Sequence, residues 1–337
     1  MRPQQQQATR AKPIYHRLDP LWRRFPFPTR PSLHVTDHGD VVQVTMARPI
    51  LGRALMTTNA WIVGDTLVDT GLADTADELV ALCRARGVTR ALLTHHHEDH
   101  AGGAASLLAA GIPVHASALT RALVSRRLPI PFYQHLVWGA SRPASLAPLA
   151  ASERVGPWAV EVLAAPGHAV DQVVFWAPES RTLLSGDAFI HERVRVFRAD
   201  EDFSATLETA RALADLPVDR LLCGHHPRLQ GGQASLRAKL GWLEELAATI
   251  HAWHADGLDL DDITRRFARE HRGGGLFELL TAGDAGFRNL ARAVLHGPVV
   301  RPEVAAALPG LATADTNVLG PGAATRAPGG ARRVRRP

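Results

Sequence analysis

Short apolar runs separated by polar turns recur along the chain up to about residue 223. Runs of this length that are rich in Val, Leu and Ile predict strands. One pair is joined by Gly64-Asp65, a dipeptide typical of a tight hairpin. We expect strands at residues 41–46, within 59–70 on either side of that turn, and at 88–94, 112–115, 158–164, 172–177, 181–186 and 218–223.

Apolar residues at helical spacing lie between several of these strands. In residues 74–86, the side chains of Leu79, Leu82 and Cys83 fall on one face of a helix. From residue 232 onward the pattern is helical throughout, and we interpret it as an appendage packed on the rest. The remaining helices that we expect lie at residues 101–110, 204–215, 232–255, 259–271 and 285–296.

Residues 125–152 interrupt the pattern, because they hold four prolines and several aromatic residues. They are either an ordered cap that shapes a binding site or a loop packed on the core. The two ends of the chain have a different composition. Residues 1–30 are rich in Gln, Pro and Arg, those past about 305 in Ala, Gly, Pro and Arg, and we expect both ends to be disordered.

The charge of the chain is concentrated in these ends. The whole chain carries +5, residues 1–30 carry +6 and residues 321–337 carry +5, which leaves about −6 for residues 31–320. A nucleic-acid-binding protein shows a basic patch on its folded part, so nucleic acid is possible as a partner but not favoured.

The cysteines and the apolar runs indicate the cellular compartment in which we expect the protein. Only Cys83 and Cys223 occur, which is no disulfide framework and fits a reducing compartment. We find no signal-peptide-like segment and no apolar run of the roughly 18 residues that a membrane helix needs. A cytoplasmic protein without a membrane segment is therefore expected.

The richest chemistry lies in residues 94–103, Thr-His-His-His-Glu-Asp-His-Ala-Gly-Gly. Neutral imidazole and carboxylate are good ligands for zinc, manganese or iron. A strand end that passes through a loop into a helix can aim such closely spaced groups at one point. We expect Gly102 and Gly103 to let the chain turn tightly there. The candidate ligands in this run are His95, His97, Asp99 and His100.

Three further candidates follow predicted strands, each directly after a glycine: Gly167-His168, Gly186-Asp187 and Gly224-His225. A glycine before a ligand lets the backbone approach a crowded site without a clash from Cβ. Together with the run at 94–103, these residues make a complete set of metal ligands.

This constellation resembles the metallo-β-lactamase superfamily of hydrolases over roughly residues 40–250. The resemblance implies an α/β (α+β) fold, a four-layer αββα sandwich, here with a C-terminal helical extension. We accordingly expect a disordered basic segment at 1–30, a catalytic domain at 31–250, a helical extension at 251–304 and a disordered basic tail at 305–337.

The resemblance also implies a role for each ligand. The first metal would be bound by His95, His97 and His168, and the second by Asp99, His100 and His225. Asp187 would bridge the two metals, and Asp69, in the segment Val-Asp-Thr-Gly, would orient the cluster without binding metal.

Three other residues are candidates on weaker grounds. His226 is expected beside the ligands or in solvent, because His225 is the residue that follows the glycine. Tyr133 and His191 are candidates to donate a hydrogen bond to a substrate oxygen.

Such a site would perform hydrolysis. Two divalent cations about 3.5–4 Å apart can share a water and generate a bridging hydroxide near neutral pH. Asp99 would orient that water and accept its proton. The expected enzyme is a hydrolase of a small-molecule ester, thioester or lactone, with two Zn²⁺ per chain and with Mn²⁺ or Fe²⁺ as possible replacements.

The branch within the superfamily stays open. The run at 94–103 is similar to that of glyoxalase II, but Gly-His-His-Pro lacks the acidic residue that follows Gly-His there. The commonest β-lactamases have Cys where Asp187 stands, and flavodiiron proteins have Glu where His97 stands. The alternatives are a phosphodiesterase or ribonuclease of the same fold, a mononuclear-iron persulfide dioxygenase, and a non-catalytic binding module.

Overall fold

The central strands of the molecule are buried on both faces, so each lies between two layers. In strand β10 (Val173–Ala177), every residue is buried. Successive side chains of a strand point to opposite faces. Phe175 joins an apolar cluster between the two sheets, whereas Val174 and Trp176 join a cluster on the opposite face. The computed structural model describes residues 31–50, 52–194, 197–270, 278, 281 and 283–307.

The first sheet has seven strands in the order of the sequence, from β1 to β7. A cluster of buried apolar side chains, with Leu79 and Cys83 among them, fills the space between this sheet and helices on its outer face. The strands are β1 (Ser32–Asp37), β2 (Val42–Ala47), β3 (Thr57–Val63), β4 (Thr66–Val68), β5 (Arg90–Leu92), β6 (Val114–Ala116) and β7 (Ala147–Pro148). The helical segments are η1 (Ala73–Thr75), α2 (Ala76–Ala85), α3 (Glu98–Ala101), α4 (Ala104–Ala109), α5 (Ala118–Val124) and α6 (Phe132–Trp138).

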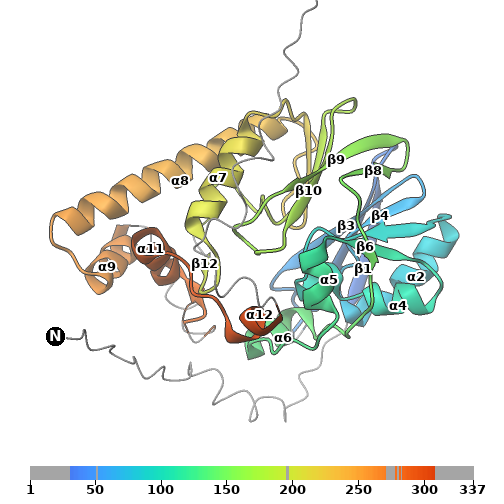
Figure 1. Cartoon of the computed structure of the whole chain (residues 1–337), viewed down its shortest axis with the longest axis horizontal. Coiled ribbons are helices and arrows are strands. Elements are labelled where there is room, and N and C mark those ends of the chain that lie inside the picture. The colour runs from blue at the N-terminus through green and yellow to red at the C-terminus, as the bar shows by residue number, and fades with distance from the viewer. Residues whose placement is uncertain are drawn as a thin grey trace, which may run out of the picture.

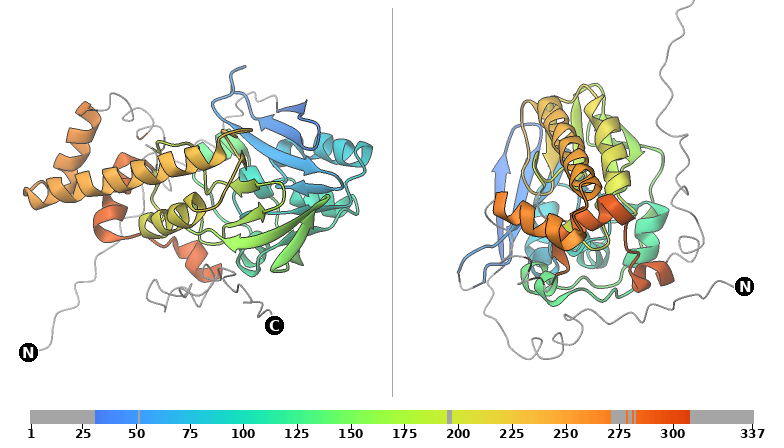
Figure 2. Two further views of the ribbon diagram at one scale, coloured as in Figure 1. Left: turned by 90° about the horizontal axis from the view of Figure 1, so that it is seen from above. Right: turned by 90° about the vertical axis from the view of Figure 1, so that its left-hand side faces the viewer.

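The second sheet has five strands in the order β13-β11-β10-β9-β8. Its outer face packs against helices through a cluster that includes Leu213 of α7 and Leu236 of α8. Helices, two facing sheets and helices again give four layers (Figures 1 and 2). The further elements are β8 (Ser152–Val155), β9 (Trp158–Ala164), β11 (Thr182–Gly186), β13 (Arg220–Cys223), α7 (Phe203–Ala214) and α8 (Gly232–Ala255).

The C-terminal segment packs on the second helical layer and also reaches the first. Its apolar cluster joins α7 and α8 to α9 (Leu260–Glu270) and α11 (Phe287–His296). The short strands β12 (Phe197–Arg198) and β14 (Ala285–Gly286) pair antiparallel, and α12 (Pro302–Ala307) packs on α5. Figure 2 shows α9 and α11 beside the long helix α8.

The four-layer αββα sandwich with a helical C-terminal part is therefore confirmed. Strands lie at the expected places along the chain, and α8 has the expected ends. The helix expected at 101–110 is instead two short helices, α3 and α4. Residues 125–152, expected to be irregular, contain α6 and β7, and buried Trp138 of α6 joins the core of the first helical layer.

Several elements were missed or differ in extent. The elements β1, β8, α5 and α12 had no apolar run long enough to predict them. Helix α12 extends to Ala307, beyond the expected start of the tail at 305, because Ala307 is buried against Leu123. Helix α8 runs across the expected domain boundary at 250. Residues 1–30 and 308–337, where we expect disorder, lie outside the described residues.

Within the described part of the chain, every helix is too short or too polar to cross a bilayer.

Phe175 tests the packing between the two sheets, because its side chain is 0% exposed there. We expect Phe175→Ala to lower the free energy of unfolding by about 3–5 kcal/mol, measured by urea denaturation, because it leaves a cavity in a close-packed layer. Val35→Ala, at a side chain that is 41% exposed, is the control. It should change stability by less than about 0.5 kcal/mol. Equal losses in the two variants would contradict this view of the core.

Candidate metal centre

The candidate ligands meet because their strands end at one edge of the sandwich. Strands β9, β11 and β13 run in the same direction, since β9 and β11 both pair antiparallel with β10 and β13 pairs parallel with β11. His168, Asp187 and His225 follow the ends of these strands. From the facing sheet, β5 leads into the run that contains the other ligands.

Three imidazoles form the first group of converging ligand atoms. Nδ1 of His97 lies 2.9 Å from Nε2 of His95 and 3.1 Å from Nε2 of His168. The three rings meet nearly edge to face, with interplanar angles of 82–87°. Three nitrogens that all point at one small volume are the arrangement that a metal ion requires.

Two carboxylates and two imidazoles form the second group, which consists of Asp99, His100, Asp187 and His225. Oδ2 of Asp99 lies 3.5 Å from Nε2 of both His100 and His225. Oδ1 of Asp187 lies 3.2 Å from Nε2 of His100, yet neither of these buried atoms makes a hydrogen bond. Two buried, unpartnered ligand atoms fit a cation between them.

Asp187 faces both groups. Its Oδ2 is 3.1 Å from Nε2 of His225 in the second group and 3.4 Å from Nε2 of His168 in the first. Its side chain is 3% exposed. One carboxylate therefore stands between two sets of ligand atoms, which suits a bridging position.

Burial and charge set the protonation of these groups. Burial holds the pKa of His95 and of His97 well below the usual range, so both rings are neutral and have a lone pair for a metal. Burial also opposes protonation of His225. The negative charge of Asp187 and its hydrogen bond with this ring outweigh the effect of burial and raise the pKa of His225 to about 9. The carboxylates of the second group thus attract positive charge, as a divalent-cation site does. The residues present fit divalent metal binding.

The outward-facing ring nitrogens are oriented by oxygen atoms. Nδ1 of His100 lies 2.8 Å from Oδ2 of Asp69, and Nδ1 of His225 lies 2.7 Å from the carbonyl oxygen of Thr57. Nδ1 of His168 lies 3.4 Å from Oε2 of Glu201 but makes no hydrogen bond with it, so only the first two rings are held in this way. An acceptor at the outer nitrogen fixes the tautomer in which the inner nitrogen can bind metal.

Asp69 also orients His95, through Thr94. The Thr94 hydroxyl donates to the Asp69 carboxylate at 2.9 Å, and it lies 3.0 Å from Nδ1 of His95. Since its hydrogen is used on Asp69, the hydroxyl accepts from His95 and leaves Nε2 of that ring with a lone pair. Asp69 thus contacts ligands of both groups, His95 through Thr94, without joining either group, and the role that the family resemblance implies for it stays a prediction.

His97 differs from the other four histidines. Its outer nitrogen, Nε2, lies 2.9 Å from Nη2 of Arg198. Arg198 and Glu201 were both missed from the sequence, because the two-residue strand β12 and the turn after it have no pattern that marks them. Lys239, also missed, lies on α8 and is buried, and burial lowers its pKa to about 8.

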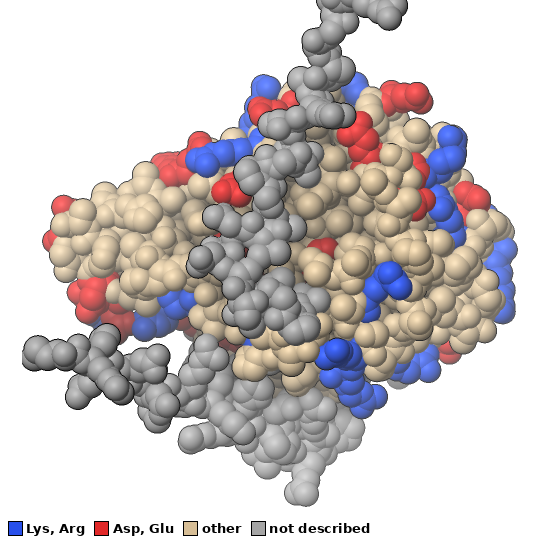
Figure 3. Space-filling model, viewed as in Figure 1, with Lys and Arg blue, Asp and Glu red and all other residues tan. Residues whose placement is uncertain are grey.

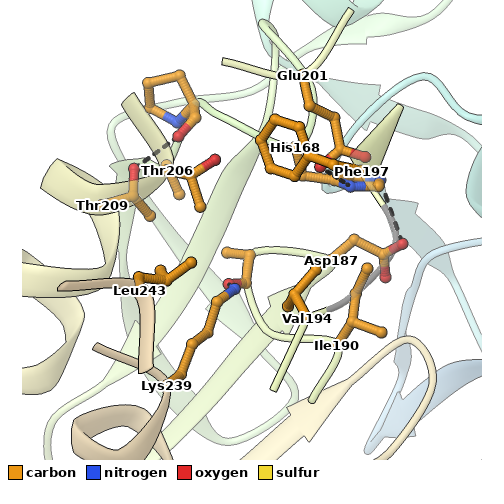
Figure 4. Close-up of a pocket in the computed structure, with 13 residues that line it drawn as sticks. His168, Asp187, Ile190, Val194, Phe197, Glu201, Thr206, Thr209, Lys239 and Leu243 are labelled. Atoms are coloured by element: carbon orange, nitrogen blue, oxygen red, sulfur yellow. Dashed lines mark hydrogen bonds and ion pairs between the residues drawn. The ribbon is translucent and has the colours of Figure 1, made fainter. Parts of the chain in front are cut away.

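Lys239 lines a small cavity beside the ligands. The cavity has a volume of about 20 Å³, which is room for about one water molecule. Figure 4 shows side chains of α7 and α8 on one side of it, with His168 and Asp187 on the other. Nζ of Lys239 donates to the carbonyl oxygen of Ala188 at 2.5 Å.

Three predicted residues lie outside the two groups. The hydroxyl of Tyr133 donates to Oδ2 of Asp284 at 2.8 Å. His191 pairs with Glu192 at 3.2 Å and has a side chain that is 49% exposed. His226 stacks edge to face on His191 and donates its backbone N–H to Sγ of Cys223. Roles for Tyr133 and His191 in substrate binding stay predictions.

The glycines of the site are needed for close packing. We expected Gly102 and Gly103 to permit a tight turn, but their φ angles of −58° and −81° suit any residue. A Cβ on Gly103 would instead lie 2.4 Å from the carbonyl oxygen of Thr70. A Cβ on Gly224 would lie 2.5 Å from Oδ1 of Asp187, which agrees with the prediction for glycines that precede ligands.

Residues 54–225 match the family model described as the metallo-beta-lactamase superfamily. The chain is 28% identical over 180 residues to the probable metallo-hydrolase YybB of Bacillus subtilis (strain 168). This match covers 50% of this chain and 80% of that protein. It is 31% identical over 137 residues to a hydroxyacylglutathione hydrolase of Bdellovibrio bacteriovorus, which covers 40% of this chain and 47% of the relative.

A solved structure shows the same fold. A beta-lactamase domain protein from Burkholderia ambifaria superposes with a TM-score of 0.59 at 17% identity. The superposition covers 82% of this chain and 92% of that one.

Gly224 offers a test of the metal centre that changes no ligand. We expect Gly224→Ala to weaken metal binding by at least about 10-fold, in the range seen when residues that support a ligand are changed. The added methyl group would displace Asp187 and His100. The measurement is a competition titration with a metal chelator.

The control for this experiment is Gly241→Ala. Gly241 lies in α8, where an added Cβ meets no atom within 4 Å. This variant should keep its metal affinity and gain about 0.5–1 kcal/mol of stability, because Ala favours a helix over Gly. Unchanged metal affinity in Gly224→Ala would show that the ligands do not hold a metal in this geometry.

Proposed function

The chain belongs to the metallo-β-lactamase superfamily of metal-dependent hydrolases, and from that premise we propose that it is a dinuclear zinc hydrolase of a small ester, thioester or lactone. The position of Asp187, with oxygens directed at both ligand groups, is the observation that carries this proposal. The first group is the set His95, His97 and His168, and the second is Asp99, His100, Asp187 and His225.

The completeness of the second group favours two metals over one. A mononuclear-iron dioxygenase of this fold would use His95, His168 and Asp187 and would not need the second group. Here the ligand atoms of that group lie within 4.8 Å of one another, and their residues are all buried. Keeping two carboxylates buried is costly unless a cation compensates them, which supports a second metal.

The residues of the chain would each have a defined part in hydrolysis. Two divalent cations bound here would lower the pKa of a water and stabilise the substrate oxygen that gains charge. Asp99, 4% exposed and directed at both histidines of its group, would orient that water and accept its proton. Asp69 would keep His95 and His100 in the tautomers that bind metal.

A small organic substrate is supported better than nucleic acid. The face in Figure 3 is largely uncharged, and its Lys and Arg side chains are scattered among Asp and Glu. A phosphodiesterase that acts on RNA or DNA needs a basic groove along which the backbone can lie. The similarity to a hydroxyacylglutathione hydrolase, whose named substrate is a thioester, supports a thioester or related acyl compound.

Metal analysis of the purified full chain tests the proposal, together with a substrate panel. We expect about two zinc ions per chain, and hydrolysis of thioesters, esters or lactones in preference to a nitrophenyl phosphodiester. One iron per chain would contradict the proposal. Preference for the diester would contradict the substrate class alone.

Asp187→Asn tests the proposed bridge. Because an amide cannot bridge two cations as a carboxylate does, we expect the variant to lose metal and activity together. The loss should exceed the ~10–100-fold typical of residues that only support a ligand. Asp37→Asn, on exposed β1, is the matched control and should change neither. A variant at 187 that keeps full turnover would rule out the assignment.

A further inference from the structure

Arg198 contacts a candidate metal ligand, His97, but it differs from the residues that orient the other ligands. Its Nη2 lies 2.9 Å from Nε2 of His97. In three of the other four histidines of the centre, the outer nitrogen is hydrogen-bonded to an oxygen of Thr94, Asp69 or Thr57. In the fourth, His168, it lies 3.4 Å from Oε2 of Glu201 without a hydrogen bond. His97 alone among these five faces a group that can only donate.

If the first group holds a metal, Nη2 of Arg198 and Nε2 of His97 can no longer form a hydrogen bond with each other. A neutral imidazole carries one N–H, so if Nδ1 of His97 gives its lone pair to a metal, the hydrogen is on Nε2. Arginine is always protonated and has no acceptor. Two N–H groups would then point at each other across 2.9 Å, and an acceptor placed beside both of them resolves the conflict.

The chain holds Arg198 in this position firmly. Nε and Nη2 of Arg198 donate to the two oxygens of Asp200, at 3.3 and 3.1 Å. Nε of Arg301 contacts Asp200 at 2.8 Å, and Nη2 of Arg301 contacts Asp284 at 3.0 Å. Tyr133 donates to the same Asp284. The backbone of Arg198 is fixed as well, because β12 pairs with β14.

Part of the guanidinium remains available for a ligand. Among the residues that the structure describes, the hydrogen-bonding partners of the Arg198 side chain are Asp200 and His97, which engage Nε and Nη2. The two N–H groups of Nη1 are left over. The side chain is 14% exposed, so it is neither sealed in the core nor free in solvent.

We propose that Arg198 selects the substrate by binding an oxyanion group, a carboxylate or a phosphate, next to the first ligand group. The oxygen of that group would accept from Arg198 and from Nε2 of His97, and the planar fork of a guanidinium suits both anions. This inference rests on the proposed hydrolase function and narrows it to acidic substrates. Asp200, Arg301, Asp284 and Tyr133 are then positioning residues for Arg198.

Direct binding of two simple anions to the metal-loaded full chain tests the proposal without turnover. We expect Arg198→Met to weaken binding of glutarate, of inorganic phosphate or of both by at least 10-fold in calorimetry. The anion that is affected identifies the chemistry that Arg198 recognises. A bound metal would attract either anion in both proteins, so the difference between them measures the contribution of Arg198.

Two further variants keep this test decisive. Arg211→Met removes an exposed arginine that pairs with Glu244, and it should change anion binding by less than 2-fold. Arg198→Lys keeps the charge without the fork and should bind better than Arg198→Met. If both changes at 198 leave the binding of both anions unchanged, or if they only lower the metal content, Arg198 is a structural residue and the proposal fails.

The KM values of two nitrophenyl esters, one with a free carboxylate and one without, test the same proposal by turnover. For the glutaryl nitrophenyl ester, we expect Arg198→Met to raise KM at least 10-fold, while the uncharged pentanoyl ester keeps its KM within 2-fold. Equal changes for both esters would overturn the proposal. If wild-type protein hydrolyses neither ester, the hydrolase function is in question, and the anion-binding arm still decides the role of Arg198.

Discussion

The candidate metal centre depends on the hydrogen bonds that the carboxylate of Asp69 makes. This carboxylate accepts from the backbone N–H and hydroxyl of Thr94 after β5, and it lies 2.8 Å from Nδ1 of His100 in α3. Asp69 itself has a φ of 62°, an unfavourable conformation that costs on the order of 1–3 kcal/mol. Hydrogen bonds to a buried charge contribute about 1.5–3 kcal/mol each, so they can offset that strain. One carboxylate therefore orients two ligands and fixes the turn that precedes them.

The layered fold brings the rest of the site to this point. Strands buried on both faces cannot shift by one residue without moving a whole set of apolar side chains to the wrong layer. The ends of β5, β9, β11 and β13 are therefore fixed against one another across the sandwich. Glycines at 186 and 224 then let two of the following loops pack so closely that a single methyl group would reach Thr94 or Asp187. The ligand geometry is therefore a consequence of core packing. Burial and neighbouring charges set whether each ligand is neutral or charged.

The C-terminal part of the chain is built into the site as well as packed beside it. Asp284 and Arg301 connect Tyr133 of α6 to Asp200, which in turn orients Arg198. This chain of buried charges reaches from the first helical layer, through the C-terminal segment, to His97. Each charge has an opposite partner, as burial of ionised groups demands. The contact of Arg198 with His97, which lies 101 positions earlier in the sequence, therefore depends on this network.

The candidate ligands could be predicted from the sequence, because a metal needs particular atoms and those atoms occur at strand ends within short, recognisable patterns. The sequence also determined most strands and the long helix α8, since a buried face imposes a period on apolar residues. It did not reveal Arg198 or Glu201, whose roles come only from contacts across about 30 to 100 positions. It assigned Gly102 and Gly103 to a turn, whereas tertiary packing against Thr70 and Gly71 is what requires them. Local patterns record which atoms are available, and only the folded chain decides which neighbours orient them.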